Sequence, residues 1–219
     1  MAKSRTRRKE EHASERILNA ALASFKARGY HGTPVRELAQ AVRIEVASLY
    51  YHYPSKQHIL FALFERIMDP LLDGLGAAMA TGATPEEQLR AAVRFHVLFH
   101  IASQDEAFVS HSELRSLSAP NLQCIIAKRD RYEHMIRTLL ATGVRTGDFE
   151  IDDIKLTSIA ILVMCSGVSD WFARQGRLTA NKVADRYADL AVRLVTRAGG
   201  RRPRQSPPVR KASRKPGHT

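Results

Sequence analysis

The sequence predicts an all-α fold of about nine helices, and two patterns lead to this fold class. Apolar residues recur at intervals of three and four along nearly the whole chain, as at Ile17, Ala21 and Phe25, which is the period of an amphipathic helix. No segment shows the alternation of apolar and polar residues that is typical of a strand. The 219 residues are 44% hydrophobic and 26% charged, the composition of a folded globular protein.

Capping residues predict where several helices begin. Ser14 can cap a first helix that ends at Gly29, and Thr33 followed by Pro34 is typical of the start of a second. Ser55 can cap a later helix in the same way. Further helix boundaries are expected at Arg43, Pro54, Gly82, Thr84, Ser118 to Pro120, Gly143 to Gly147, and Gly176.

Pro70 lies inside the helix that is expected to begin near Ser55. Proline has no backbone N–H, so it cannot complete the hydrogen bond that a helix requires at that position. The sequence therefore predicts that Pro70 kinks this helix or divides it.

The net charge of +12 lies at the two ends of the chain. Residues 1–9 contribute +5 and residues 199–219 contribute +7, and neither segment contains an acidic residue. Residues 10–198 therefore have no net charge. The C-terminal segment is polar and rich in proline, so we expect it to be disordered. Two interpretations stay open for it: an arm that binds a polyanion such as DNA, or a solubilising tail without a specific partner.

Several classes of protein find no support in the sequence. The longest uncharged stretch, residues 156–169, is shorter than the ~20 residues that a membrane-spanning helix needs. The basic N-terminus lacks the apolar segment of a secretion signal, so a cytoplasmic location is expected. Cys124 and Cys165 have no CxxC spacing, and we expect no metal and no cofactor. Because no phosphate-binding glycine loop, nucleophile elbow or H-E-x-x-H pair occurs, no enzyme activity is expected.

Three short helices are expected between residues 14 and 53, and only a few residues around Arg43 and Ile44 separate the last two. This is the spacing of a helix-turn-helix motif, whose last helix enters the major groove of DNA. A small core would hold the motif together, formed by Val35, Leu38, Ala39, Val42, Ile44 and Leu49.

The motif also carries a family resemblance. The stretch Thr33-Pro34-Val35-Arg36-Glu37-Leu38-Ala39-Gln40, followed by Ser48-Leu49-Tyr50-Tyr51-His52-Tyr53-Pro54-Ser55-Lys56, resembles the DNA-binding segment of the TetR family of bacterial repressors. The resemblance covers about residues 12–66. It implies a helix-turn-helix DNA-binding domain (12–54) and a larger helical ligand-binding and dimerisation domain (55–198). The charge pattern adds a basic N-terminal arm (1–11) and a disordered basic tail (199–219).

The resemblance implies that the third helix reads DNA. Val46, Ala47 and Ser48 would lie at its exposed start, where apolar atoms can touch thymine methyl groups and a hydroxyl can reach a base edge. Arg36 has the planar fork that binds guanine bidentately. The other expected DNA contacts, which would face phosphates, are Thr33, Tyr50, Tyr51, His52 and Lys56. For Tyr50 and Tyr53 the alternative is simple packing within a small helical domain.

Two residues depart from the family pattern. Arg43 stands where the family usually has glycine, so it would occupy a turn position that favours a residue tolerant of positive φ. Glu45 stands where a small capping residue is usual. Its carboxylate can cap the third helix, accept from cytosine or repel a phosphate.

A mostly apolar effector pocket is expected in the larger domain. Aromatic, thioether and imidazole side chains suit such a pocket, although each of them could equally belong to the ordinary core. The candidates are His96, Phe99, His100, Tyr132, Met135, Met164, Val168, Trp171 and Phe172. His96 and His100 have the spacing of a metal-binding pair, but no acidic third ligand accompanies them. Gln104-Asp105-Glu106 and the stretch from Gly176 to Ala180 resemble family members that sense acyl-coenzyme A esters.

The family resemblance implies a homodimer that forms through the last two helices, expected at about residues 152–174 and 179–197. Ala184, Ala188 and Ala191 share one helix face and would allow close approach of a second copy. The alternative is a monomer in which these residues face inward. The sequence thus predicts a repressor that a small hydrophobic or acyl-coenzyme A-like effector releases from a palindromic operator. The other interpretation is an architectural protein that binds DNA through its basic tails without sequence preference.

Overall fold

The computed structural model describes residues 2–196, with the side chains of residues 10–196. The basic segment 199–219, for which disorder was expected, lies outside the described residues. Within them the chain is helical and contains no strand, which confirms the all-α fold class. The helices are α1 (Ala2–Arg28), α2 (Val35–Val42), α3 (Val46–His52), α4 (Lys56–Met79), α5 (Pro85–Ala102), α6 (Gln104–Ser112), the 3-10 helix η1 (Leu114–Ser116), α7 (Ala119–Thr146), α8 (Ile154–Ser166), α9 (Val168–Trp171) and α10 (Ala180–Val195).

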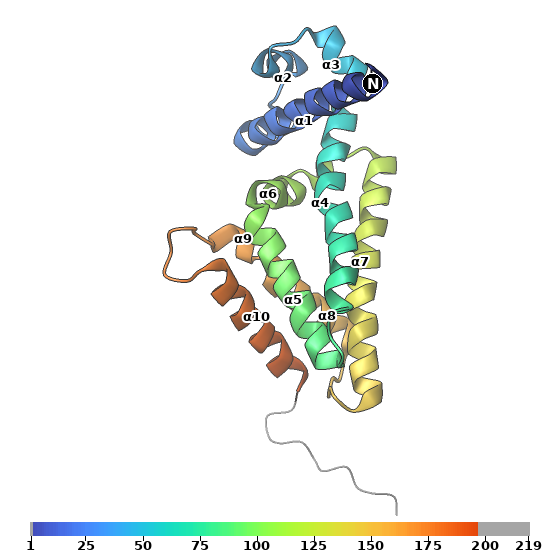
Figure 1. Ribbon diagram of the computed structural model, residues 1–219, viewed down its shortest axis with the longest axis vertical. Coiled ribbons are helices and arrows are strands. Elements are labelled where there is room, and N and C mark those ends of the chain that lie inside the picture. Colours follow the sequence, from blue (N-terminus) through green and yellow to red (C-terminus); the bar gives the residue numbers. More distant parts are fainter. Residues whose placement is uncertain (1, 197–219) are drawn as a thin grey trace, which may run out of the picture.

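The helices form a small head and a long bundle. Helices α1, α2 and α3 make the head, and α4 leaves it and runs down into the bundle beside α5 and α7 (Figure 1). Helix α6 lies between the two parts, where it contacts both α1 and α4. Helix α10 lies along α5 on the other side of the bundle from α7 (Figure 1).

Most of the expected helix ends in the N-terminal half are confirmed. Gly29 and Arg43 follow helices in the left-handed backbone region, with φ of 74° and 57°. The Ser55 hydroxyl accepts from the backbone N–H of His58 and caps α4. Thr84 caps α5 in a capping box with Glu87, in which each side chain accepts from the other residue's backbone N–H.

Two of these predictions are wrong, and a third is wrong in one of its two alternatives. Ser14 caps nothing, because α1 begins at Ala2 and the chain is already helical before Ser14. Thr33 does not cap α2: Pro34 holds that position, and the Thr33 hydroxyl donates instead to the carbonyl oxygen of Gly29, at 2.9 Å. Pro70 does not divide α4, which continues through it to Met79. Of the two outcomes expected there, the division is wrong and the kink stays a prediction.

The helices of the C-terminal half differ in their bounds from those expected. Helix α7 continues through Gly143 and ends before Gly147, whose φ is 80°. The helix expected over residues 152–174 is two helices, because Gly167 separates α8 from α9. By length and composition alone, Ile154–Trp171 is apolar enough to cross a membrane. In this fold α8 and α9 both pack against α5.

The alanine stripe of α10 faces the chain's own bundle. Ala184, Ala188 and Ala191 are all buried against the protomer, mainly along α5. Ion pairs from Arg90 to Asp189 and from Arg94 to Asp185 hold the same two helices together. The expectation that these alanines meet a second copy is therefore wrong: small residues do allow close helix packing here, but the partner helix belongs to the same chain.

Candidate DNA-binding head and ligand pocket

The head is built around the expected small core. Leu38, Ala39, Val42 and Leu49 are buried, and Val35 and Ile44 are partly buried against them. Arg16 of α1 donates to the carbonyl oxygen of Val42 at 2.5 Å, which attaches the end of α2 to α1. This packing fixes the orientation of α2 and α3 relative to each other and leaves their outer faces open.

Those outer faces carry most of the residues expected to meet DNA. Arg36 on α2 and Ala47, Ser48, Tyr50 and Tyr51 on α3 are exposed. Val46 is half-buried at the start of α3. The exposure of Tyr50 excludes simple packing for that ring. Tyr53, by contrast, is partly buried against the core, and burial raises the pKa of its phenol.

Three expected phosphate contacts are engaged within the head instead. Thr33 is fully buried, so its side chain cannot reach DNA in this arrangement. The Lys56 ammonium donates to the carbonyl oxygen of Tyr30 and lies 4.2 Å from the centre of the Tyr30 ring. His52 is half-buried, with Nδ1 3.2 Å from the hydroxyl of Ser14. Each of these polar groups is satisfied by the protein, which the sequence pattern could not reveal.

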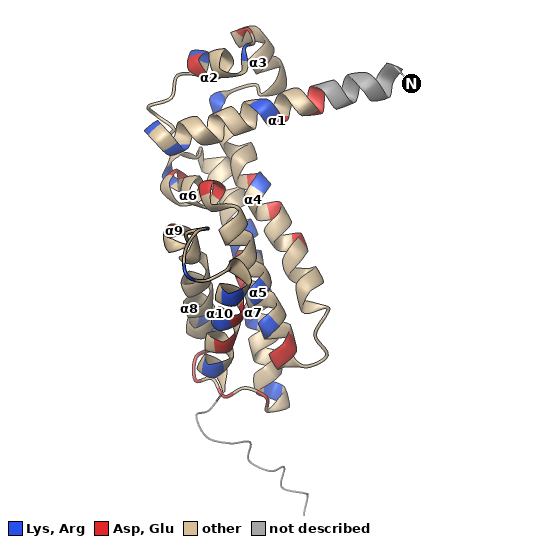
Figure 2. Cartoon of the chain, turned by 60° about the vertical axis from the view of Figure 1, so that its left-hand side comes forward, with Lys and Arg blue, Asp and Glu red and all other residues tan. Residues whose placement is uncertain are grey.

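The two departures from the family pattern lie side by side at the turn. Arg43 adopts the left-handed conformation that was expected there. Glu45 holds the N-cap position of α3, but its side chain accepts no capping hydrogen bond and is exposed. Acidic and basic residues are interspersed along the described helices (Figure 2), in line with the charge balance of residues 10–198. The described part of the head therefore does not present a broadly positive surface.

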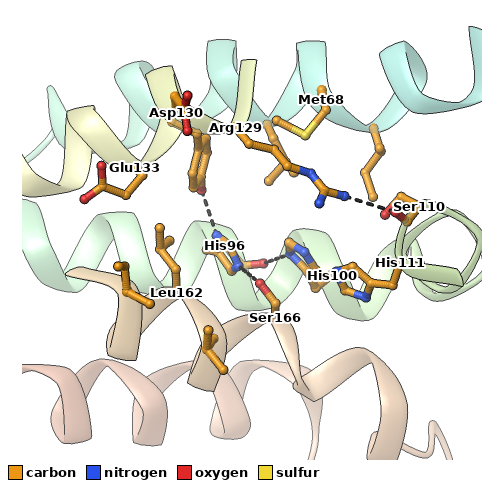
Figure 3. Close-up of a pocket in the computed structure, with 15 residues that line it drawn as sticks. Met68, His96, His100, Ser110, His111, Arg129, Asp130, Glu133, Leu162 and Ser166 are labelled. Carbon is orange, nitrogen blue, oxygen red and sulfur yellow. Dashed lines mark hydrogen bonds between the residues drawn. The ribbon is translucent and has the colours of Figure 1, made fainter. Parts of the chain in front are cut away.

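A cavity of about 390 Å³ lies in the bundle, in the size range of small-molecule sites (Figure 3). Five helices contribute to its wall. The lining residues are Ile67, Met68 and Leu71 of α4, His96 and His100 of α5, Ser110 and His111 of α6, Arg129, Asp130, Tyr132 and Glu133 of α7, and Ile159, Leu162, Val163 and Ser166 of α8.

The sequence predicted three of these lining residues: His96, His100 and Tyr132. The other six candidates do not line the cavity. Trp171 is exposed and its ring stacks on that of Tyr187 of α10, and Val168 is buried in the core. The remaining four, which are buried or half-buried among core side chains, are Phe99, Met135, Met164 and Phe172.

A buried polar network forms one wall of the cavity. Nδ1 of His96 lies 2.8 Å from the hydroxyl of Tyr132, and Nε2 lies 3.0 Å from that of Ser166 (Figure 3). The ring of His100 stacks on that of His96, with centroids 4.2 Å apart. Burial lowers the pKa of His96 well below its usual range and that of His100 to about 4, so both rings are neutral at physiological pH. Among the described residues, no cluster of three or more His, Cys, Asp or Glu could hold a metal ion.

One cation lines the same cavity. Arg129 is half-buried, and its guanidinium donates to the carbonyl oxygen of Ser110, at 3.0 Å, near the end of α6. Arg129, Ser110 and His111 lie at one end of the pocket, away from Glu133 (Figure 3). No sequence pattern singled out Arg129, because a lone arginine on an amphipathic helix is usually solvated.

Helix α6 connects this cavity to the head. Asp105 at its start pairs with Lys26 of α1, at 2.5 Å, and Glu106 pairs with Arg66 of α4, at 2.6 Å. Arg66 also donates to the side chain of Asn19 of α1. A shift of α6 would therefore change the contacts that hold α1 of the head in place.

A second polar connection joins the head to the bundle at the start of α4. The Gln57 amide of α4 donates to the hydroxyl of Tyr30 and to the carbonyl oxygen of Ser116. Its oxygen accepts from the backbone N–H of Ser118, just before α7. The start of α4 is thus tied to the head and to the bundle at once.

Comparisons with known proteins place both parts of the chain in one family. Residues 17–63 match the family model for bacterial regulatory proteins of the tetR family, and residues 82–195 match that for the tetracyclin repressor-like C-terminal domain. A curated relative, the HTH-type transcriptional repressor KstR2 of Mycobacterium tuberculosis, is 27% identical over 84% of this chain and 92% of its own length.

Solved structures agree. A bacterial regulatory protein in the tetR family from Rhodococcus RHA1 is 30% identical, with a TM-score of 0.80 over 85% of this chain and 98% of that chain. AibR, solved in complex with isovaleryl coenzyme A and operator DNA, is 27% identical, with a TM-score of 0.73 over 81% of this chain and 97% of that chain.

Proposed function

This chain belongs to the TetR family of bacterial regulatory proteins, and on that premise we propose that it is a homodimeric transcriptional repressor released from a palindromic operator by a small amphipathic effector. The observation that carries the proposal is the connection of an exposed helix-turn-helix to a cavity through α6. Because its partner would be operator DNA, we expect the protein to act in the cytoplasm.

We expect α3 to enter the major groove and α2 to lie across its edge. Ala47 and Ser48, with Val46 beside them, would meet base edges, and Arg36 would read a guanine. Tyr50 and Tyr51 are exposed and would donate their hydroxyls to phosphates. Thr33 and Lys56 would support this surface from inside, through Gly29 and Tyr30, rather than touch DNA.

An apolar stripe on the last helices is the surface for a second copy. Leu156, Ile159 and Val163 follow one face of α8, and Leu190 and Leu194 follow one face of α10; all five are exposed in the single chain. Such a stripe is typical of an interface between protein chains. The symmetric dimer that it would form can present two heads to two half-sites about 34–36 Å apart.

The same stripe borders the pocket. Ile159 and Val163 line the cavity and yet are 41% and 67% exposed. A second copy seated on α8 would cover this side of the cavity and exclude water from it. Effector binding and dimer geometry would then depend on the same two side chains.

The effector is expected to combine an apolar body with a polar group. Ile67, Met68, Leu71 and Leu162 provide apolar walls, and His96 is held in place on both ring nitrogens by its polar neighbours. A medium-chain acyl group fits a cavity of about 390 Å³. The similarity to AibR, whose solved complex contains isovaleryl coenzyme A, makes acyl-coenzyme A esters the first compounds to test.

Footprinting on the DNA upstream of the gene, against random DNA of equal length, tests the operator. We expect one protected palindrome. Arg36→Ala should weaken binding by about 10- to 100-fold for each half-site, in line with ~1–3 kcal/mol for each bidentate contact, and relax the preference at one base pair in each half-site. The control is Arg145→Ala, an exposed arginine at the far end of α7. Equal protection of random DNA, with a steep salt dependence, would instead support the architectural interpretation.

Sedimentation of the Val163→Glu variant tests the dimer surface. A buried, unpaired carboxylate at the centre of the stripe should convert the dimer to monomer at micromolar concentration. Ile126→Glu on α7 is a matched control, because Ile126 is also an exposed, large apolar residue but lies outside the stripe. A Val163→Glu protein that remains dimeric would move the interface elsewhere.

A further inference from the structure

Arg129 is a half-buried cation without a negatively charged partner among the described residues. Its guanidinium donates to one group, the carbonyl oxygen of Ser110. The two carboxylates that line the same cavity do not pair with it: Glu133 accepts from Ser158 and pairs with Arg137, and Asp130 is exposed. Arginines elsewhere on the bundle, such as Arg66 and Arg90, do have carboxylate partners.

Such an arrangement is costly unless something else satisfies the charge. A guanidinium stays ionised in proteins and carries five N–H donors. The single carbonyl oxygen of Ser110 can accept from only a minority of them. Burial lowers the pKa of Arg129, which is the direction expected when no anion offsets the loss of water. The neighbouring imidazoles of His96 and His100 are neutral and supply no negative charge.

We propose that Arg129 is the anion receptor of the pocket, so that the effector is an amphipathic anion. Its carboxylate or phosphate would take the free side of the guanidinium, and its apolar chain would lie against Met68, Leu71 and Leu162. This inference rests on the proposed function, because it names the chemical class of the effector of that same pocket.

The position of Arg129 also indicates how binding would be transmitted. Ser110 lies in the last turn of α6, where backbone carbonyls have no partner within the helix, so Arg129 acts as a cap for that helix end. An anion that draws the guanidinium away removes this cap. The first turn of the same helix carries Asp105, which pairs with Lys26 of the head. A single helix, α6, therefore connects the cavity cation Arg129 to the head.

Binding of four probes to the purified full-length protein, measured by calorimetry without DNA, tests the inference. The probes are decanoate, decanoyl-coenzyme A, decanol and coenzyme A alone. Decanoate or decanoyl-coenzyme A should bind at least 10-fold more tightly than decanol, since hydrogen bonds to charged groups contribute ~1.5–3 kcal/mol. Tight binding of decanoate assigns the site to a free carboxylate, and tight binding of the ester alone assigns it to a phosphate.

Arg129→Gln should remove the preference for the anion, by about 10-fold or more, and leave decanol affinity within 2-fold. Arg129→Lys, which keeps the charge without the planar fork, should retain part of that preference. Arg131→Gln, an exposed arginine on the same helix, is the matched control and should behave as the wild type.

Two results would overturn the inference: no anionic probe bound better than decanol by the wild type, or an unchanged preference for the anion in Arg129→Gln. Neither result depends on the footprinting experiment, which compares upstream DNA with random DNA for the wild type. Failure of the footprint would therefore reject the proposed repressor, whereas failure here would reject only the class of effector.

Discussion

The stacked histidines of the pocket should make the protein less stable in mild acid. Burial, together with the nearby His111, lowers the pKa of His100 to about 4, from an ordinary value of ~6.5 in the unfolded chain. Between these two values the unfolded chain binds a proton that the folded chain refuses, so the free energy of unfolding falls as the pH falls. The contribution of His100 is fully present above pH ~6.5, is reduced by about 1.4 kcal/mol at pH 5.5, and is reduced by about 3 kcal/mol at pH 4.

His96 acts in the same direction, because burial and the neighbouring His100 also lower its pKa. Urea unfolding at fixed protein concentration, between pH 7.5 and pH 5.5, measures the effect. Because glutamine does not titrate, the fall in the free energy of unfolding over this interval should be about 1.4 kcal/mol smaller in His100→Gln than in the wild type. His134→Gln, at an exposed position of α7, should lose as much as the wild type. An equal loss in the wild type and His100→Gln would refute the assignment of a buried neutral His100.

Three further variants test other parts of the structure. Lys56→Ala removes a hydrogen bond to Tyr30 and a cation–π contact, so thermal unfolding should show a head that is less stable by about 1–2 kcal/mol, with weaker binding of operator and random DNA alike. Glu106→Gln breaks the ion pair with Arg66, and in a gel-shift titration the effector should then release less operator DNA at saturation. Removal of residues 199–219 should leave the sedimenting species a dimer and lower DNA affinity mainly at low salt, as expected for a basic segment acting through screened charge.

The helix-turn-helix could be predicted from sequence because local rules determine it. Gly29 and Arg43 end helices through backbone conformation, Ser55 and Thr84 cap through their own hydroxyls, and Leu38 belongs to a core formed by neighbours in sequence. None of these features needs a distant partner. A local pattern was therefore enough to place them.

The pocket and the dimer surface could be predicted only in part, because they depend on which helices meet. Helical period shows that Met68 and Met164 both face other helices, but it does not show that only Met68 faces a cavity. The alanines of α10 indicated a close helix contact, but the sequence does not show that α5 of the same chain makes it. In the same way, Lys56 was a candidate phosphate contact, but the sequence does not show that its ammonium donates to Tyr30 instead.

The strength of the α6 connection fits the work that a repressor switch requires. A tenfold loss of operator affinity needs only ~1.4 kcal/mol of coupling between the two sites. The Lys26–Asp105 pair has about half of each side chain exposed, and such pairs contribute roughly 0–1 kcal/mol. The Arg66–Glu106 pair, 26% and 19% exposed, is more shielded and is reinforced by Asn19, so it should contribute more. Together they are strong enough to transmit a shift of α6, yet weak enough for the binding energy of one small ligand to overcome.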